Sequence, residues 1–468
     1  MLSVSYAAAA AAMLIAALYL FLRLRLYLTT TTMLVGSLLL IYGPAYLSYT
    51  LSSGEPGFLI NRLAGATGQA HPIFAIIGNR VSDLDAVMIA MNLSIALMYI
   101  GIIAGIEAVD WLLPKRTAVM SAALTHWDHQ ELRDDIGGSH ILLLAITALV
   151  VLMSYHSIKE GHIATIWNFL SIPGGDNNVA RNAFRHHHGG SPSYLYRLVL
   201  NAIAPMFIIW GTLAAWVHRS WALSAIVLML FIVTLIGKME ILSKTPAAFL
   251  IIQLIVAGLL LLTNKISWRS ALTITLLISL VLYATTQVIM VFPDISSALS
   301  AIYSRVFEAE NQSLLENFAT FPAIHPHMWG ANIRPIATLM GMEHLPAYKI
   351  VAYTWYGTHD VTSPSLFIAD AWADFSYAGV LAFSILAGAA CRLIDATFLP
   401  HGKTVVVVAV LGATFMGIVT LLTTALNTAF TSGGLLLAPI LAGLLMAVIR
   451  RFRPQPAASP IGQTYQDK

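Results

Sequence analysis

Apolar runs of about 20 residues recur from one end to the other of this chain of 468 residues. A membrane-spanning helix needs about 20 apolar residues to cross roughly 30 Å of hydrocarbon, whereas a membrane strand needs about 10 residues of alternating polarity. The runs in this chain are unbroken and do not alternate, which excludes a β-barrel. The sequence therefore predicts an all-α, polytopic integral membrane protein.

The composition supports this class and excludes others. Hydrophobic residues make up 58% of the chain and charged residues 10%, against about 25% charged residues in an ordinary soluble domain. The formal net charge is +3 and no basic tract is present, which argues against a nucleic-acid-binding protein. Cys391 is the only cysteine, so neither an intrachain disulfide nor a cysteine-based metal site can form.

Eleven runs are long enough, or nearly so, to span the membrane. They are residues 3–22, 28–50, 86–107, 139–157, 196–217, 220–237, 246–263, 270–291, 376–394, 404–426 and 433–449. Arg23 and Arg25 follow the first run and a basic cluster at 450–453 follows the last, and the positive-inside rule places both in the cytoplasm. We therefore expect about 11 transmembrane helices (10–12) in a single domain, residues 1–468, with a periplasmic N-terminus and a cytoplasmic C-terminus.

The segment 292–375 is the longest connection and lies on the outer side in this topology, as a large periplasmic loop before the last three spans. It mixes aromatic, charged, Pro and His residues, so we expect it to fold against the membrane surface. Within it, His325, His327 and Trp329 place rings beside polar groups. That pattern suits binding to sugars and equally suits a helix that lies in the membrane interface.

Basic side chains gather on the expected outer side, against the positive-inside rule. Arginine meets phosphate with a planar fork of donors, and lysine binds it as a point charge. We expect these side chains to bind an anionic, membrane-embedded headgroup such as a lipid-linked diphosphate. The alternative is pairing with local acids and with outer-leaflet phosphates. The residues are Arg181, Arg185, Lys244, Arg305 and Arg334.

Two carboxylates precede the ninth run. Asp370 and Asp374 are four residues apart, so on a helix they share one face. A carboxylate that enters an apolar span is a candidate functional group, which could act as general base on an acceptor hydroxyl or pair with an outer arginine. We favour Asp370 for this role, because Asp374 better fits a charge stabilised by a helix N-terminus.

Three short patches complete the pattern. They are Lys244-Thr245-Pro246 at the start of an apolar run, Arg305-Val306-Phe307 in the long segment, and Ser363-Pro364-Ser365 followed by Asp370 and Phe375-Ser376-Tyr377-Ala378-Gly379-Val380. In this layout the chain resembles the O-antigen polymerase family, the oligosaccharide repeat-unit polymerases of bacterial surface polysaccharides. The resemblance covers roughly residues 175–395.

The resemblance implies a bacterial inner-membrane glycosyltransferase that moves a growing glycan from undecaprenyl diphosphate onto another lipid-linked repeat. The expected partners are undecaprenyl-diphosphate-linked oligosaccharide, the lipid bilayer, a chain-length regulator and a flippase, with no nucleic acid. No metal or other cofactor is expected, since cationic side chains can neutralise a leaving diphosphate. The candidate catalytic residues are Arg305, Arg334 and Asp370, and the candidate substrate-binding residues are Arg181, Arg185, Lys244, His325, His327 and Trp329.

Two other functions stay open. An O-antigen ligase would use the same diphosphate site, and the Arg-to-Gly loop motif of some polymerases is absent after Arg181 and Arg305. A flippase or transporter of the lipid-linked oligosaccharide would place ionisable residues in mid-span. The spans here are nearly free of charge, which favours chemistry at the surface over transport.

Overall fold

The computed structural model describes residues 1–55, 72–134, 139–159, 194–238, 245–267, 302–357 and 365–452, together with isolated residues between 269 and 283. These residues form helices and their connections. β-Pairing within the described ranges is limited to two isolated bridges, Tyr27 with Lys265 and Arg133 with Thr404. The predicted all-α class is thus confirmed for the described part of the chain.

Eight helices or pairs of consecutive helices in the described ranges are long and apolar enough to span a bilayer. They are α1 (Leu2–Leu22), α2 with α3 (Thr30–Tyr42 and Pro44–Leu51), α6 (Leu84–Leu112), α8 (Ser139–Lys159), α11 with α12 (Tyr194–Leu198 and Ala204–His218, joined by the π-helical turn η2, Val199–Ile203), α13 (Trp221–Lys238), α20 (Phe367–Phe398) and α21 (Val405–Thr423). Two shorter apolar helices are α14 (Thr245–Leu262) and α23 (Leu437–Phe452). Every predicted run except 270–291, which lies largely outside the described residues, coincides with one of these helices. The polytopic class is confirmed, and the number of spans stays a prediction.

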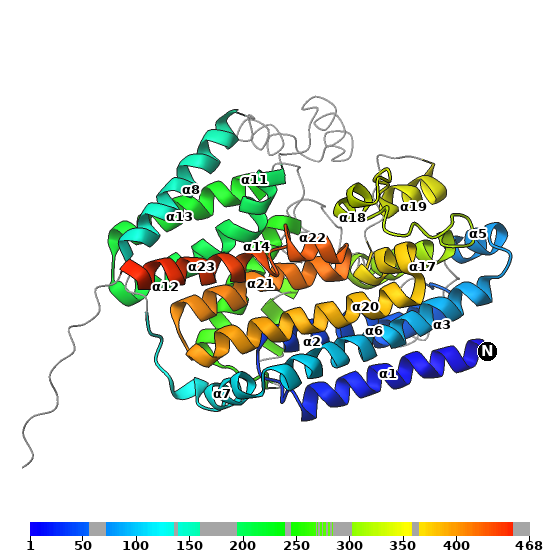
Figure 1. Ribbon diagram of the computed structural model, residues 1–468, viewed down its shortest axis with the longest axis horizontal. Coiled ribbons are helices and arrows are strands. Elements are labelled where there is room, and N and C mark those ends of the chain that lie inside the picture. The colour runs from blue at the N-terminus through cyan, green and yellow to red at the C-terminus, as the bar shows by residue number, and fades with distance from the viewer. Residues whose placement is uncertain are drawn as a thin grey trace, which may run out of the picture.

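The remaining helices are short. They are α5 (Pro72–Arg80), α7 (Pro114–Thr125), η1 (Trp127–His129), η3 (Ser304–Glu308), α17 (Ala309–Thr320), α18 (Arg334–Leu339), α19 (Ala347–Tyr356), η4 (Leu399–His401) and α22 (Leu426–Phe430). Figure 1 shows the start of α1 and the end of α23 at opposite ends of the bundle, with α5, α17, α18 and α19 gathered at the end where α1 begins. The described part of segment 292–375 is therefore folded and packs on one end of the bundle.

Helices α6 and α20 form the closest pair in the bundle. A Cβ added at Gly105 would lie 2.1 Å from the carbonyl oxygen of Ile385, and one at Gly388 would lie 2.2 Å from that of Ile102. Glycine lets the two backbones touch, as small residues do at helix contacts in membranes. Since Gly101 faces Ser384 while Gly105 faces the next turn of α20, the two helices run in the same direction.

Helix α20 begins earlier than the predicted run at 376 and contains a break. Its first turns start at Phe367, and all side chains from Phe367 to Asp374 except that of Asp370 are buried. The helix is interrupted at Phe375 (φ −132°) and Ser376 (φ +56°). The end of the predicted outer loop is therefore helical. It packs on α17 through Trp372, whose ring stacks on that of Phe318 at 4.8 Å.

Candidate functional site

The structure places the predicted site residues in three groups. Arg181, Arg185 and Lys244 lie outside the described residues. Arg305 lies in the π-helical turn η3, and its side chain is also outside the description. The remaining residues are His325, His327, Trp329 and Arg334, in the stretch 325–334, and Asp370 at the start of α20. Hydrogen bonds join this stretch to α20, as described next.

The stretch 328–332 docks onto the break in α20. In an unbroken helix the carbonyls of Ala373 and Asp374 would accept from the amides four residues later. Here they accept from the amides of Met328 (2.8 Å) and Trp329 (3.0 Å). This loop therefore supplies the hydrogen bonds that the break would otherwise leave unmade.

Asp374 anchors the same loop with its side chain. One carboxylate oxygen, Oδ1, accepts from the backbone amides of Gly330 (2.9 Å) and Asn332 (3.3 Å). The residue is fully buried, and Oδ2 has no hydrogen-bond partner among the described residues. Asp374 thus fixes the loop, a role that differs from the helix-dipole interpretation drawn from the sequence.

Asp370 has a more open setting. It lies one turn before Asp374 and is partly exposed, and its Oδ1 accepts from the side-chain amide of Asn332 at 2.6 Å. That bond fixes the direction of the carboxylate and leaves part of it accessible. Of the two acids, Asp370 is the one that a ligand could reach.

Asn332 links the parts of the site, and sequence reasoning missed it. Its backbone amide donates to Asp374, its side-chain amide donates to Asp370, and its Oδ1 accepts from the amide of Ala347 (2.8 Å) at the start of α19. Its carbonyl also lies 3.2 Å from Nε2 of His344. A neutral residue in a loop gives no pattern that would have singled it out.

The predicted sugar-binding and cationic side chains lie in the stretch 325–334, which includes the docked loop. Trp329 is 64% exposed with φ +51°, and His325 and Arg334 are also exposed. His327 is half-buried, with its ring edge-on to Trp372 at 5.4 Å. The structure therefore places exposed aromatic, imidazole and guanidinium groups in the same stretch as Asn332, which hydrogen-bonds to Asp370.

A buried acid supports the helices behind the loop. Glu316 of α17 is fully buried, and its Oε1 accepts from the hydroxyl of Tyr356 (2.7 Å) and the amide of Gln312 (2.9 Å). Burial and the neighbouring Glu316 carboxylate raise the pKa of the Tyr356 phenol, so it stays protonated and donates. The indole of Trp355 donates to the Glu316 carbonyl (3.1 Å), which joins α17 to α19.

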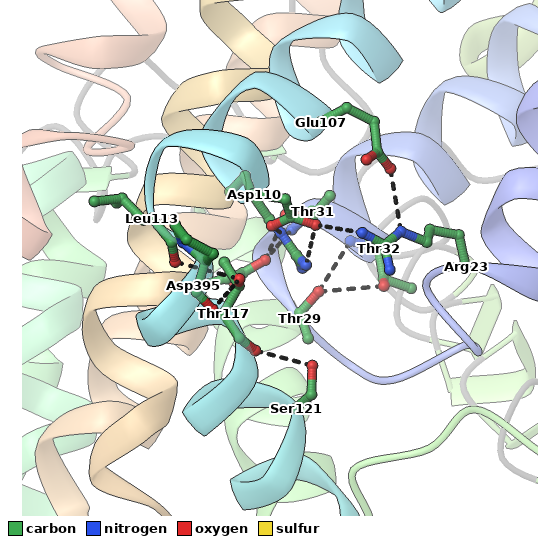
Figure 2. Close-up of polar contacts among 12 residues, drawn as sticks. Arg23, Thr29, Thr31, Thr32, Glu107, Asp110, Leu113, Thr117, Ser121 and Asp395 are labelled. Atoms are coloured by element: carbon green, nitrogen blue, oxygen red, sulfur yellow. Dashed lines mark hydrogen bonds and ion pairs between the residues drawn. The ribbon is translucent and has the colours of Figure 1, made fainter.

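A second polar cluster lies at the other end of α6 and α20 (Figure 2). Arg392 of α20 donates to both oxygens of Asp110 (2.6 and 2.8 Å), and Arg23 donates to the same carboxylate at 3.0 Å. Asp395 accepts from the backbone amide and hydroxyl of Thr31, at the start of α2. These hydrogen bonds join α20 to α6 and to α2 and leave the charged groups of the cluster paired. We therefore interpret the cluster as structural.

Among the described residues, no group of three or more His, Cys, Asp or Glu side chains is arranged to hold a metal ion. Comparison with known protein families, curated proteins and solved structures found no match for the chain. The function therefore has to be inferred from the chemistry of the site.

Proposed function

We propose that this chain is a membrane glycosyltransferase that polymerises undecaprenyl-diphosphate-linked oligosaccharide repeat units into O-antigen or exopolysaccharide on the periplasmic face of the bacterial inner membrane. The observation that carries the proposal is the hydrogen bond from Asn332 to Asp370. It ties a partly exposed acid to the stretch 325–334, which bears His325, Trp329 and Arg334. An oriented base beside cationic and aromatic groups is what transfer from a lipid diphosphate to a sugar hydroxyl needs.

In the proposed reaction, Asp370 accepts the proton of an acceptor hydroxyl while that oxygen forms a bond to the anomeric carbon of the donor sugar. The bond between this carbon and the diphosphate oxygen breaks, and its electron pair leaves with undecaprenyl diphosphate. Arg334 and Arg305 neutralise the charge that develops on the leaving group. The proton gained by Asp370 passes to solvent, since the residue is partly exposed.

Trp329 and His325 have the chemistry to bind the glycan. A sugar ring presents C–H groups on its faces and hydroxyls on its edge, so it fits an exposed indole next to a hydrogen-bonding imidazole. Both side chains are available for this, because Trp329 is 64% exposed and His325, four residues before it, is also exposed. His327 would support this sugar-binding surface from the protein side, where its ring packs on Trp372.

The test is complementation of a deletion strain, with surface and lipid-linked glycans compared by size. Asp370→Asn should remove the glycan ladder and leave single lipid-linked repeats, because general-base catalysis contributes about 10²–10⁴-fold. Arg334→Ala should have the same effect, and Arg116→Ala, in the exposed α7 at the other end of α6, should not. All variants should be present in the membrane in equal amounts.

Three other results would contradict the proposal. Normal glycan ladders from both Asp370→Asn and Arg334→Ala would show that neither residue is needed and would contradict the assigned site. In the deletion strain, a full-length ladder retained on the carrier lipid would indicate a ligase. Single repeats trapped on the cytoplasmic side would indicate a flippase.

A further inference from the structure

A groove lies along α19 and residues 324–325, with Arg80 at the end of α5 on one side. It consists of two adjoining hollows of about 280 and 460 Å³ that share His325 and Tyr353 as lining residues. The other residues that line it are Leu345, Pro346, Lys349, Ile350, Arg80, Ile324 and Thr354. All of these except His325 were missed by sequence reasoning, because α5 and α19 meet only in the folded chain.

Arg80 is fixed in place before any ligand binds. Its guanidinium lies 5.4 Å from the ring centroid of Trp355, and it donates to the carbonyl oxygen of Thr354. These two contacts hold the end of α5 against α19. A side chain that is already ordered loses less entropy when it binds a ligand.

The groove carries positive charge with no matching acid. Neither Arg80 nor Lys349 forms an ion pair with a carboxylate among the described residues. Both side chains are exposed on the groove. Two cations without an acidic partner in the described part of the chain, one of them a guanidinium, are suited to phosphate oxygens.

The hollow beside Lys349 is mostly apolar. Leu345, Pro346 and Ile350 line it beside Lys349, and Leu339, at the end of the neighbouring α18, is 88% exposed. Exposed apolar side chains next to basic ones are typical of a protein surface at the membrane interface. A fitting occupant therefore has an anionic head and an apolar tail.

We propose that this groove binds the phosphate or diphosphate head of a membrane lipid, with Arg80 and Lys349 contacting the phosphate oxygens and Leu345 and Ile350 contacting the start of the tail. The assignment goes beyond the proposed glycosyl transfer, because binding of a lipid head here requires no reaction. It also adds two cationic residues to those that the sequence pointed to.

The experiment measures binding by the purified full-length chain in phosphatidylcholine nanodiscs. The probes are farnesyl diphosphate, inorganic diphosphate and farnesol. The wild type should bind farnesyl diphosphate more tightly than either of the other two. The double variant Arg80→Gln/Lys349→Gln should bind it about tenfold more weakly or worse, since it loses charge-assisted hydrogen bonds. The matched control is Lys115→Gln/Arg116→Gln, an exposed pair on α7, which should bind as the wild type does.

Two outcomes overturn the assignment. One is equal binding of farnesyl diphosphate by the wild type and the double variant. The other is equal binding of inorganic and farnesyl diphosphate by the wild type, which would show an anion site without a lipid. Lys349→Glu provides a second variant that leaves the Arg80 contacts to Trp355 intact, and it should also weaken binding. The wild type and the double variant are also compared in the Arg334→Ala background, because the proposed glycosyl transfer assigns the donor diphosphate to Arg334. Loss of probe binding with Arg334→Ala alone would point to the transfer site, and loss with the groove variants would point to the groove, so the two proposals fail separately.

Discussion

Two carboxylates one helical turn apart have different surroundings in this protein. Asp374 is fully buried and accepts two backbone amides of the docked loop, whereas Asp370 is partly exposed and accepts one side-chain amide. A buried acceptor that is removed leaves its donors unsatisfied, while an accessible one can be replaced by water. The same residue type therefore serves structure at one position and is available for chemistry at the other.

We expect Asp374→Ala to destabilise the protein. The amides of Gly330 and Asn332 would lose their acceptor, at a cost of about 1–3 kcal/mol for each buried unsatisfied group. Asp370→Ala, the matched control, should cost less because water can reach Asn332 there. Thermal unfolding in detergent, followed by size-exclusion chromatography, measures the difference. Equal melting temperatures for the two variants would contradict the anchoring role of Asp374.

The sequence identified the acids of the site and not the residue that orients them. Asp370 and Asp374 stood out because charge is rare near an apolar run. Asn332 did not, because its hydrogen bond to Asp370 joins residues that are 38 positions apart and exists only after the loop docks. Glu316 was missed for a similar reason, since its partner Tyr356 belongs to another helix.

At the scale of helices, backbone contact between α6 and α20 sets the centre of the bundle. Gly105 and Gly388 lie where a side chain would collide with the opposite backbone. Apolar runs located both helices, as they located nearly all the others. The break at Ser376 could not be predicted in the same way, because its φ of +56° is not typical of serine and is maintained by the loop at 328–332.

We expect Gly105→Ala to weaken the packing of α6 on α20. The new Cβ would lie 2.1 Å from the carbonyl oxygen of Ile385, so one helix must move, and overpacking of this kind costs about 1–3 kcal/mol. Gly258→Ala on α14 is the control, because a Cβ there meets nothing within 4 Å and alanine is the better helix former by about 1 kcal/mol. Opposite shifts in melting temperature are expected. Equal shifts would mean that α6 and α20 do not touch at Gly105.

For the whole molecule, the direction of the helices constrains the topology. Helices α6 and α20 run in the same direction, as the facing pairs Gly101 with Ser384 and Gly105 with Ile385 require. Two parallel spans in one chain need an odd number of crossings between them. The described helices α8, α12, α13 and α14 would supply four of these crossings, and the predicted run 270–291 would supply the fifth. This parity agrees with eleven spans and with termini on opposite sides.

The last prediction concerns the proposed topology, in which the end of the bundle with the candidate site faces the periplasm. Cys391 is fully buried, so the wild type should not react with a membrane-impermeant maleimide, and single cysteines can report on their surroundings. Leu339→Cys, beside the candidate site, should be labelled in cells with only the outer membrane opened. Lys115→Cys, on α7 at the other end of α6, should be labelled only after the inner membrane is opened. Labelling of both from one side would contradict the arrangement of the ends. Reversed labelling would keep that arrangement and place the site in the cytoplasm, where a periplasmic polymerase could not work.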